Sequence, residues 1–229
     1  MNLIATLKAR SAAISMNKGK YDEAMKQYEE AIAAGLNEPR YLLSYSVLLI
    51  REGQYTKARE LLVRHQKNPL LKDDSRRQLF VNYAVCVLKL GETQKGIELL
   101  ERQHQKEPSG LIYQTLGYLY VEVGDTEKAL RFNEEALAYD DEDPITLDNL
   151  GQVYYRLLND PATAKDYFQR AIALKPGQID TLYFLAQYDI QAGDKEAAKE
   201  KLETALKGRF SPLNYATRDM VQSMLESLA

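Results

Sequence analysis

The chain has 229 residues, of which 45% are hydrophobic and 28% are charged. This composition is ordinary for a folded protein and excludes bulk disorder. The net charge of −3 provides no basic field for nucleic acid, and the single cysteine, Cys86, excludes an intramolecular disulfide or a cysteine-based metal cluster.

The start of the chain does not have the pattern of a signal peptide. Lys8 and Arg10 interrupt it before an apolar core of about 7–15 residues can form. The longest apolar run, residues 41–50, is about half the length that spans a bilayer. We therefore expect a soluble, cytoplasmic protein, with membrane association only through an anchor upstream of this chain.

The strongest pattern is an internal repeat of about 34 residues. Small residues recur at a first slot with spacings of 34, 38, 33, 34 and 35: Ala12, Ser46, Ala84, Gly117, Gly151 and Ala186. A second small slot follows twelve or thirteen residues later: Ala24, Ala58, Gly96, Ala129, Ala164 and Ala198. Glycine marks a turn between the slots, except in the fifth repeat, where Asn159-Asp160-Pro161 stands with one extra residue. Because small residues let helix backbones approach closely and glycine ends helices, each repeat is predicted to be a helix, a tight turn and a second helix.

The fifth repeat resembles a tetratricopeptide repeat. It reads Leu147-x2-Leu150-Gly151-x2-Tyr154, followed by Ala164-x3-Phe168, Ala171 and Pro176. This resemblance implies an all-α, right-handed superhelical solenoid of stacked antiparallel helix pairs. Six such repeats are expected at residues 1–37, 38–74, 75–109, 110–143, 144–178 and 179–211. A capping helix is expected at residues 212–229, with Ser211-Pro212 as its N-cap and first turn.

The second and third repeats depart most from the pattern. Their 38-residue spacing adds about four residues near 65–75, which predicts a longer loop or an extended first helix capped by Asp73, Asp74 or Ser75. We interpret this as ordinary variation between repeats, and a partner-specific feature is the alternative.

The resemblance also implies a concave face lined by the first helix of each repeat. Residues three before, one after and four after the first slot share one stripe of that helix. The stripe is apolar in repeats one to three, and it is rich in tyrosine and glutamine in repeats four to six. An exposed apolar row typically marks an interaction surface, and tyrosine and glutamine suit a peptide backbone. The candidate peptide-binding residues are Leu43, Val47, Val81, Val85, Gln114, Tyr118, Asp148, Gln152, Tyr155, Tyr183 and Gln187. The alternative is that many of them pack against neighbouring helices.

The sequence contains little that indicates catalysis. It has two histidines, His65 and His104, and none of the familiar catalytic or phosphate-binding motifs. Cys86 lies among apolar residues and is expected to be buried, and the acidic run 140–143 lacks the spacing of a calcium loop. We expect no enzyme activity, cofactor, metal, nucleic acid or small-molecule substrate. The predicted function is a non-catalytic scaffold that binds a peptide or protein segment in the concave groove. The alternative is an assembly module that self-associates weakly through the groove or through its uncapped first repeat.

Overall fold

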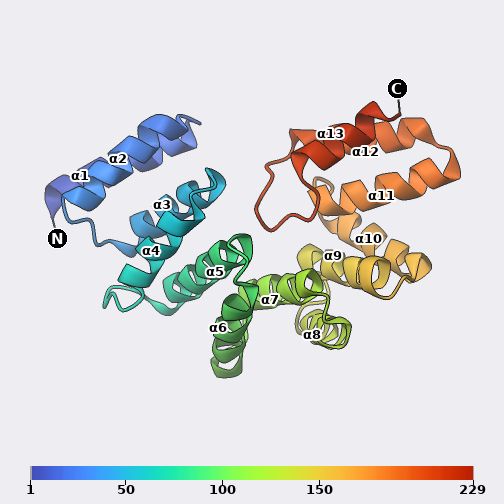
Figure 1. Ribbon diagram of the computed structural model, residues 1–229, viewed down its shortest axis with the longest axis horizontal. Coiled ribbons are helices and arrows are strands. Elements are labelled where there is room, and N and C mark those ends of the chain that lie inside the picture. The colour runs from blue at the N-terminus through green and yellow to red at the C-terminus, as the bar shows by residue number, and fades with distance from the viewer. Residues whose placement is uncertain (1, 229) are drawn as a thin grey trace. The chain divides into compact units, whose positions relative to one another are not determined.

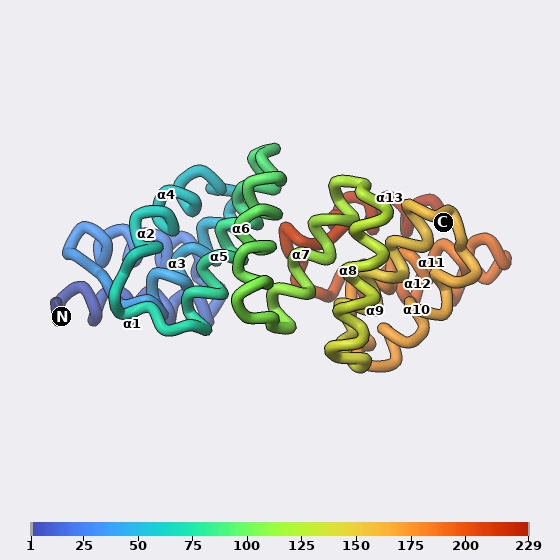
Figure 2. The backbone as a smooth tube through the Cα atoms, turned by 90° about the horizontal axis from the view of Figure 1, so that it is seen from below, coloured from blue at the N-terminus to red at the C-terminus, as the bar shows by residue number. Residues whose placement is uncertain are grey.

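The fold is all-α, as the sequence predicts. The computed structural model describes residues 2–228, and within that range it contains helices and no β-strand (Figure 1). The chain divides into two compact units, residues 1–107 and residues 108–229, called here the N-terminal and C-terminal units. In Figure 2 the blue-to-green tube shows the helices of the N-terminal unit following one another in chain order. Within residues 2–228, no helix has both the length and the apolar character required to cross a membrane.

The N-terminal unit consists of three helix pairs. Its helices are α1 (Leu3–Asn17), α2 (Tyr21–Ala33), α3 (Pro39–Arg51), α4 (Tyr55–His65), α5 (Asp73–Lys89) and α6 (Thr93–Lys106). The predicted small slots are buried where the two helices of a pair meet, as at Ala12 and Ala24. In the third pair, a Cβ atom on Gly96 would lie 3.0 Å from the Val87 side chain, so the close approach of α5 and α6 explains the glycine.

The long spacing between the second and third pairs is accommodated by α5. This helix runs for 17 residues and begins at Asp73. The cap differs from the expectation: Lys72 is the N-cap without a side-chain bond, and Asp73 and Asp74 lie in the first turn. Asp74 instead pairs with Arg77 one turn later. Acidic residues stabilise a first turn through the helix dipole, which explains their position without a cap.

The C-terminal unit contains three more helix pairs and a final helix. They are α7 (Gly110–Val123), α8 (Thr126–Tyr139), α9 (Pro144–Gln152) continued by the π-helix η1 (Val153–Leu157), α10 (Pro161–Leu174), α11 (Ile179–Ala192), α12 (Lys195–Lys207) and α13 (Arg218–Glu226). Gly124 and Gly193 end α7 and α11 with φ of +73° and +81°. In the fifth pair Asn159 has φ +52°, and η1 accommodates the extra residue, because a π-helical turn holds one residue more than an α-helical turn.

The final helix begins later than the sequence predicts. Thr217 is its N-cap, because its hydroxyl accepts the Met220 N–H at 3.2 Å. Residues 208–217, called here the strap, form a non-helical connection instead of a first turn at Ser211-Pro212. Figure 1 draws the strap as the long loop between α12 and α13. The later start leaves the backbone of the strap available for contacts elsewhere in the C-terminal unit.

Candidate functional site

In the N-terminal unit, the predicted site residues differ in their accessibility. Leu43 and Val47 on α3 are half-buried, whereas Val81 and Val85 on α5 are only 4% and 5% exposed. The helix α5 packs against α3, α4 and α6, which leaves little of its surface open. The expected exposed apolar row is therefore reduced to the two residues of α3.

In the C-terminal unit, the predicted residues lie on three successive first helices, α7, α9–η1 and α11. This surface is called here the first-helix face, and it consists of Gln114, Tyr118, Asp148, Gln152, Tyr155, Tyr183 and Gln187. Tyr118, Asp148 and Gln152 are buried, and the other four are half-buried. The buried members form the base of the face, so the accessible part consists of aromatic and amide side chains.

Asp148 connects α9 to α11. Its carboxylate accepts the Thr181 hydroxyl at 2.5 Å and the Gln152 side-chain amide at 2.8 Å. Burial raises the pKa of Asp148, and the bonds from Thr181 and Gln152 partly oppose that shift. Because internal donors occupy both oxygens, Asp148 positions its neighbours and offers no free carboxylate to a ligand.

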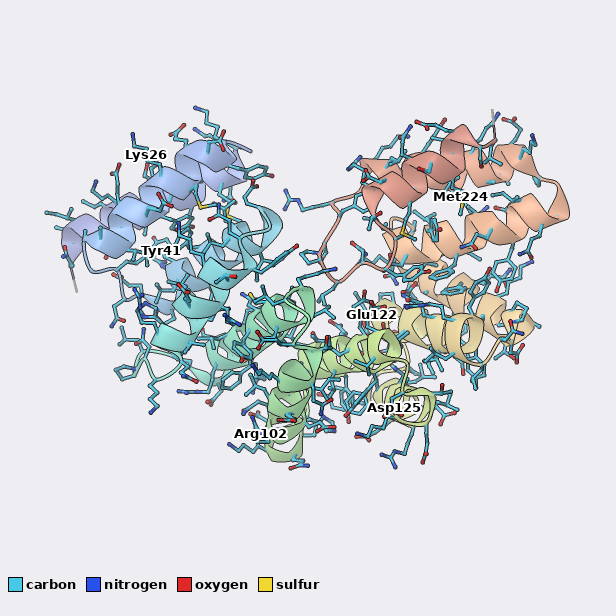
Figure 3. The ribbon with its side chains drawn as sticks, in the orientation of Figure 1. Lys26, Tyr41, Arg102, Glu122, Asp125 and Met224 are labelled. Carbon is cyan, nitrogen blue, oxygen red and sulfur yellow. The ribbon has the colours of Figure 1, made fainter. Side chains whose placement is uncertain are left out.

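Arg156 lies in the π-helical turn and contacts the first-helix face. Its guanidinium donates to Glu122 on α7 at 2.7 Å and to the side chain of Gln152 at 2.8 Å; Glu122 is labelled in Figure 3. The ion pair between Arg156 and Glu122 is largely shielded, with 19% and 24% of the two side chains exposed. In the fourth repeat the residue five positions after the first slot is Glu122 itself, which is half-buried, whereas the residues at that position in the other four repeats are exposed: Asn17, Arg51, Lys89 and Gln191. The Arg156–Glu122 pair therefore joins the first helices of the fourth and fifth repeats.

The strap lies on the first-helix face through Asp180 of α11. The Asp180 carboxylate accepts the Asn214 side-chain amide at 3.2 Å and the backbone N–H groups of Tyr215 and Ala216 at 3.1 and 3.0 Å. Burial, followed by the negative charge of Asp148, raises the pKa of Asp180 to about 7. One carboxylate therefore binds three consecutive residues of the strap.

The ring of Tyr215 makes the second set of contacts between the strap and the face. It stacks on Phe184, with ring centroids 5.3 Å apart and planes inclined by 18°. The Arg156 guanidinium carbon lies 4.0 Å from the centroid of the Tyr215 ring, a favourable cation–π distance. Tyr183, a predicted site residue, lies 6.3 Å from the same ring.

The remaining half-buried residues are held by hydrogen bonds along the face. The Tyr155 hydroxyl donates to the Gln187 side chain at 3.0 Å, linking η1 to α11. Gln114 donates to Asp143, the N-cap of α9, at 3.0 Å. These bonds position a row of polar groups that can exchange partners with a ligand.

Sequence reasoning missed the four residues whose side chains attach the strap: Arg156, Asp180, Phe184 and Tyr215. The one available signal was the thirteen-residue interval between Gly151 and Ala164, which marks the π-helical turn. Tyr215 lies in a segment whose apolar spacing favoured a helix, so its contact with α11 had no local signal.

The N-terminal unit has a separate open pocket of about 410 Å³ between α4, α5 and α6. Its lining includes Leu62, Phe80 and Leu99, with Lys95 and Arg102 among its polar members. None of the sequence-predicted site residues lines it.

Comparisons with known proteins place the repeats in a family. The family model described as anaphase-promoting complex, cyclosome, subunit 3 matches residues 17–103, and the model described as tetratricopeptide repeat matches residues 115–179. A search of the curated proteins found no match.

Solved structures share the fold. A tetratricopeptide repeat protein from Parabacteroides merdae has a TM-score of 0.80 at 13% identity, covering 98% of this chain and 84% of that chain. The type IV pilus biogenesis factor PilW has a TM-score of 0.68 at 16% identity, covering 98% and 100%. A thermophilic repeat protein from Thermus thermophilus has a TM-score of 0.66 at 20% identity, covering 83% and 98%. The helix pairs, the small-residue slots and these matches show together that the chain belongs to the tetratricopeptide repeat family.

Proposed function

We propose that this protein is a non-catalytic scaffold whose first-helix face in the C-terminal unit binds a segment of a partner protein. Tetratricopeptide repeats generally serve as protein-interaction modules. The observation that supports the choice of face is the strap: a non-helical stretch of polypeptide already lies there, held by backbone N–H groups and one aromatic ring.

The chemistry of the face suits such a ligand. Tyr155 and Tyr183 provide apolar area and a hydroxyl at low entropic cost, and Gln187 can donate and accept hydrogen bonds with a peptide backbone. The hydrogen bond between the Tyr155 hydroxyl and the Gln187 side chain holds two of these groups in position. On α3 of the N-terminal unit, the half-buried Leu43 and Val47 are the candidate apolar anchors.

A peptide-display selection on the folded chain tests the proposal. Selected peptides are synthesised with a fluorophore and titrated by anisotropy against the wild type and Gln187→Ala. Removing the Gln187 amide should weaken binding by about tenfold, equivalent to about 1.4 kcal/mol for one hydrogen bond. Tyr139→Ala is the matched control, because Tyr139 is a 55% exposed tyrosine on the second helix α8.

Two results would reject the proposal. The first is that Gln187→Ala binds the selected peptides as tightly as the wild type and the Tyr139→Ala control do. The second is that selections against both the wild type and Tyr215→Ala, in which the strap loses its aromatic contact, return no binder.

One observation favours self-association as a second function. The helix α1 exposes Leu3, Ile4, Leu7 and Ile14, with between 48% and 64% of each residue accessible. Residues at this spacing lie on one side of a helix, and a second copy of the chain could cover them. Sedimentation equilibrium tests this: the wild type should dimerise, and Ile4→Ser with Leu7→Ser should remain monomeric. A monomeric wild type would reject this function.

A further inference from the structure

We infer that the strap is a built-in occupant of the first-helix face, and that a partner segment must replace it. The strap residues Asn214 and Tyr215 then indicate the class of partner: a segment with an aromatic side chain and a free backbone N–H group at that residue. This inference rests on the proposed function and names the ligand class and the regulation of the same site.

Asp180 mainly binds backbone groups of the strap. Two of its three donors are the N–H groups of Tyr215 and Ala216, which any residue except proline also provides. The third donor is the side chain of Asn214. A foreign segment can therefore replace the Tyr215 N–H with a different sequence, provided that proline is absent at that position, while the Ala216 N–H stays on Asp180.

The contacts of Tyr215 select an aromatic side chain. Its ring stacks on Phe184, which in turn stacks on the buried Phe168 at 4.9 Å between centroids. The Arg156 guanidinium at 4.0 Å adds an attraction that requires a π system. A segment with an aliphatic residue at this position loses both contacts, so it would compete poorly with the strap.

The Asn214-Tyr215 part of the strap can leave the face without separating the helices on either side of it. Arg218 at the start of α13 donates to the carbonyls of Leu206 and Gly208 at 3.0 and 3.4 Å, which ties the two ends of the strap together. Val221 and Leu228 are buried in the same apolar cluster as Leu202 of α12, and Ala216 of the strap is fully buried in it too. The strap is thus a loop closed at its base by Ala216, and the contacts that can be exchanged without opening the cluster are those of Asn214 and Tyr215.

A labelled peptide with the sequence of residues 208–217 tests the inference on the full-length chain. The tethered strap competes at an effective concentration in the millimolar range, so the wild type should bind this peptide weakly. Tyr215→Ala weakens the tethered competitor and should bind the peptide about tenfold more tightly. Arg209→Ala is the matched control, because Arg209 is an exposed strap residue, and it should bind like the wild type.

A second substitution locates the binding. Adding Arg156→Ala to Tyr215→Ala should remove the tenfold gain, because the peptide's own tyrosine then lacks its cation. Circular dichroism and thermal unfolding are recorded for every variant, and peptide affinities are compared among the folded variants. Gly208 is left unchanged, since a Cβ there would lie 2.9 Å from the Ile179 side chain. Asp180 is left unchanged because the strap backbone donates to it.

Equal affinity of the wild type and Tyr215→Ala for the strap peptide would overturn the inference. The inference would also be overturned if the library-selected peptides lacked an aromatic residue, or if they bound the wild type and Tyr215→Ala equally through Gln187. Each of these results would leave the proposed function intact. Selections that return no binder from either chain would instead reject the proposed function and, with it, this inference.

Discussion

The backbone of Gly151 on α9 lies directly against the ring of Phe168 on α10. A Cβ atom at position 151 would stand 2.6 Å from Cδ1 and 2.9 Å from Cζ of that ring. Phe168 is fully buried and stacks on Phe184 of the next helix pair, so the ring has no free direction in which to move. The first small slot of the fifth repeat is therefore a requirement of packing between the two helices.

Gly151→Ala should destabilise the C-terminal unit by about 1–3 kcal/mol, the usual cost of forcing an extra carbon into a packed core. Urea unfolding followed by circular dichroism measures the loss. Gly110→Ala is the control, since a Cβ at position 110 meets nothing within 4 Å. Equal stabilities for the two variants would contradict the packing argument.

Asn159 occupies the left-handed position that glycine occupies in the turns of the other helix pairs. Its φ of +52° is tolerated by asparagine and by glycine, and it is costly for other residues. Asn159→Ala should lose about 1 kcal/mol of unfolding free energy, whereas Asn159→Gly should stay within about 0.5 kcal/mol of the wild type. Thermal unfolding of the pair checks this, and an alanine variant as stable as the glycine variant would disprove it.

Asp180 should make the stability of the chain depend on pH. Its pKa rises from 3.8 to about 7 on folding, so between these values the folded chain binds a proton that the unfolded chain has released. The stabilising contribution is complete below pH 4 and is lost as the pH rises towards 7, by up to about 1.4 kcal/mol per pH unit.

The comparison with Asp180→Asn measures this effect together with the interaction between Asp180 and Asp148, whose pKa burial also raises. Burial lowers the pKa of His65, which gives a contribution of opposite sign in the same range, and the variant retains it. Urea unfolding from pH 4.5 to 7.5 should show a steeper fall in stability for the wild type than for Asp180→Asn. Parallel curves would show that Asp180 titrates normally.

Cys86 should be inert in the folded chain. It is fully buried, and burial raises the pKa of its thiol to about 12, so almost no thiolate exists at pH 8. A maleimide should modify it only after denaturant is added. Val63→Cys supplies the control, because Val63 is 45% exposed and a thiol there should react at once in the folded protein. If the folded Val63→Cys chain reacted rapidly with maleimide at both of its cysteines, the prediction would be wrong.

The repeat architecture could be read from the sequence because it depends on local rules. Small residues at fixed intervals, such as Gly117 and Gly151, report the close approach of two helices, and the structure confirms that a side chain at either position would clash. Gly124 and Gly193 likewise mark helix ends through their positive φ. These signals lie within one helix pair and do not depend on the rest of the fold.

The accessibility of the stripe could not be read in the same way. Helical periodicity assigns Val81, Tyr118 and Tyr155 to the same side of their helices, yet the first two are buried and the third is half-buried. Which side chains remain accessible depends on packing between elements that are distant in sequence. The strap is the clearest case, because Tyr215 contacts Arg156, 59 residues earlier in the chain.

The π-helical turn has a consequence for how such a surface can be gained or lost genetically. One inserted codon between Gly151 and Ala164 lengthens this interval by one residue, and the π-helical turn absorbs it while the flanking helix pairs keep their own intervals. Deleting one residue between positions 153 and 160 is the reverse step, and it restores the twelve-residue interval. The strap would keep its bonds to Asp180 and its stacking on Phe184, so the Arg156 contact is the one part of its attachment that lies within reach of an in-frame change of three nucleotides here.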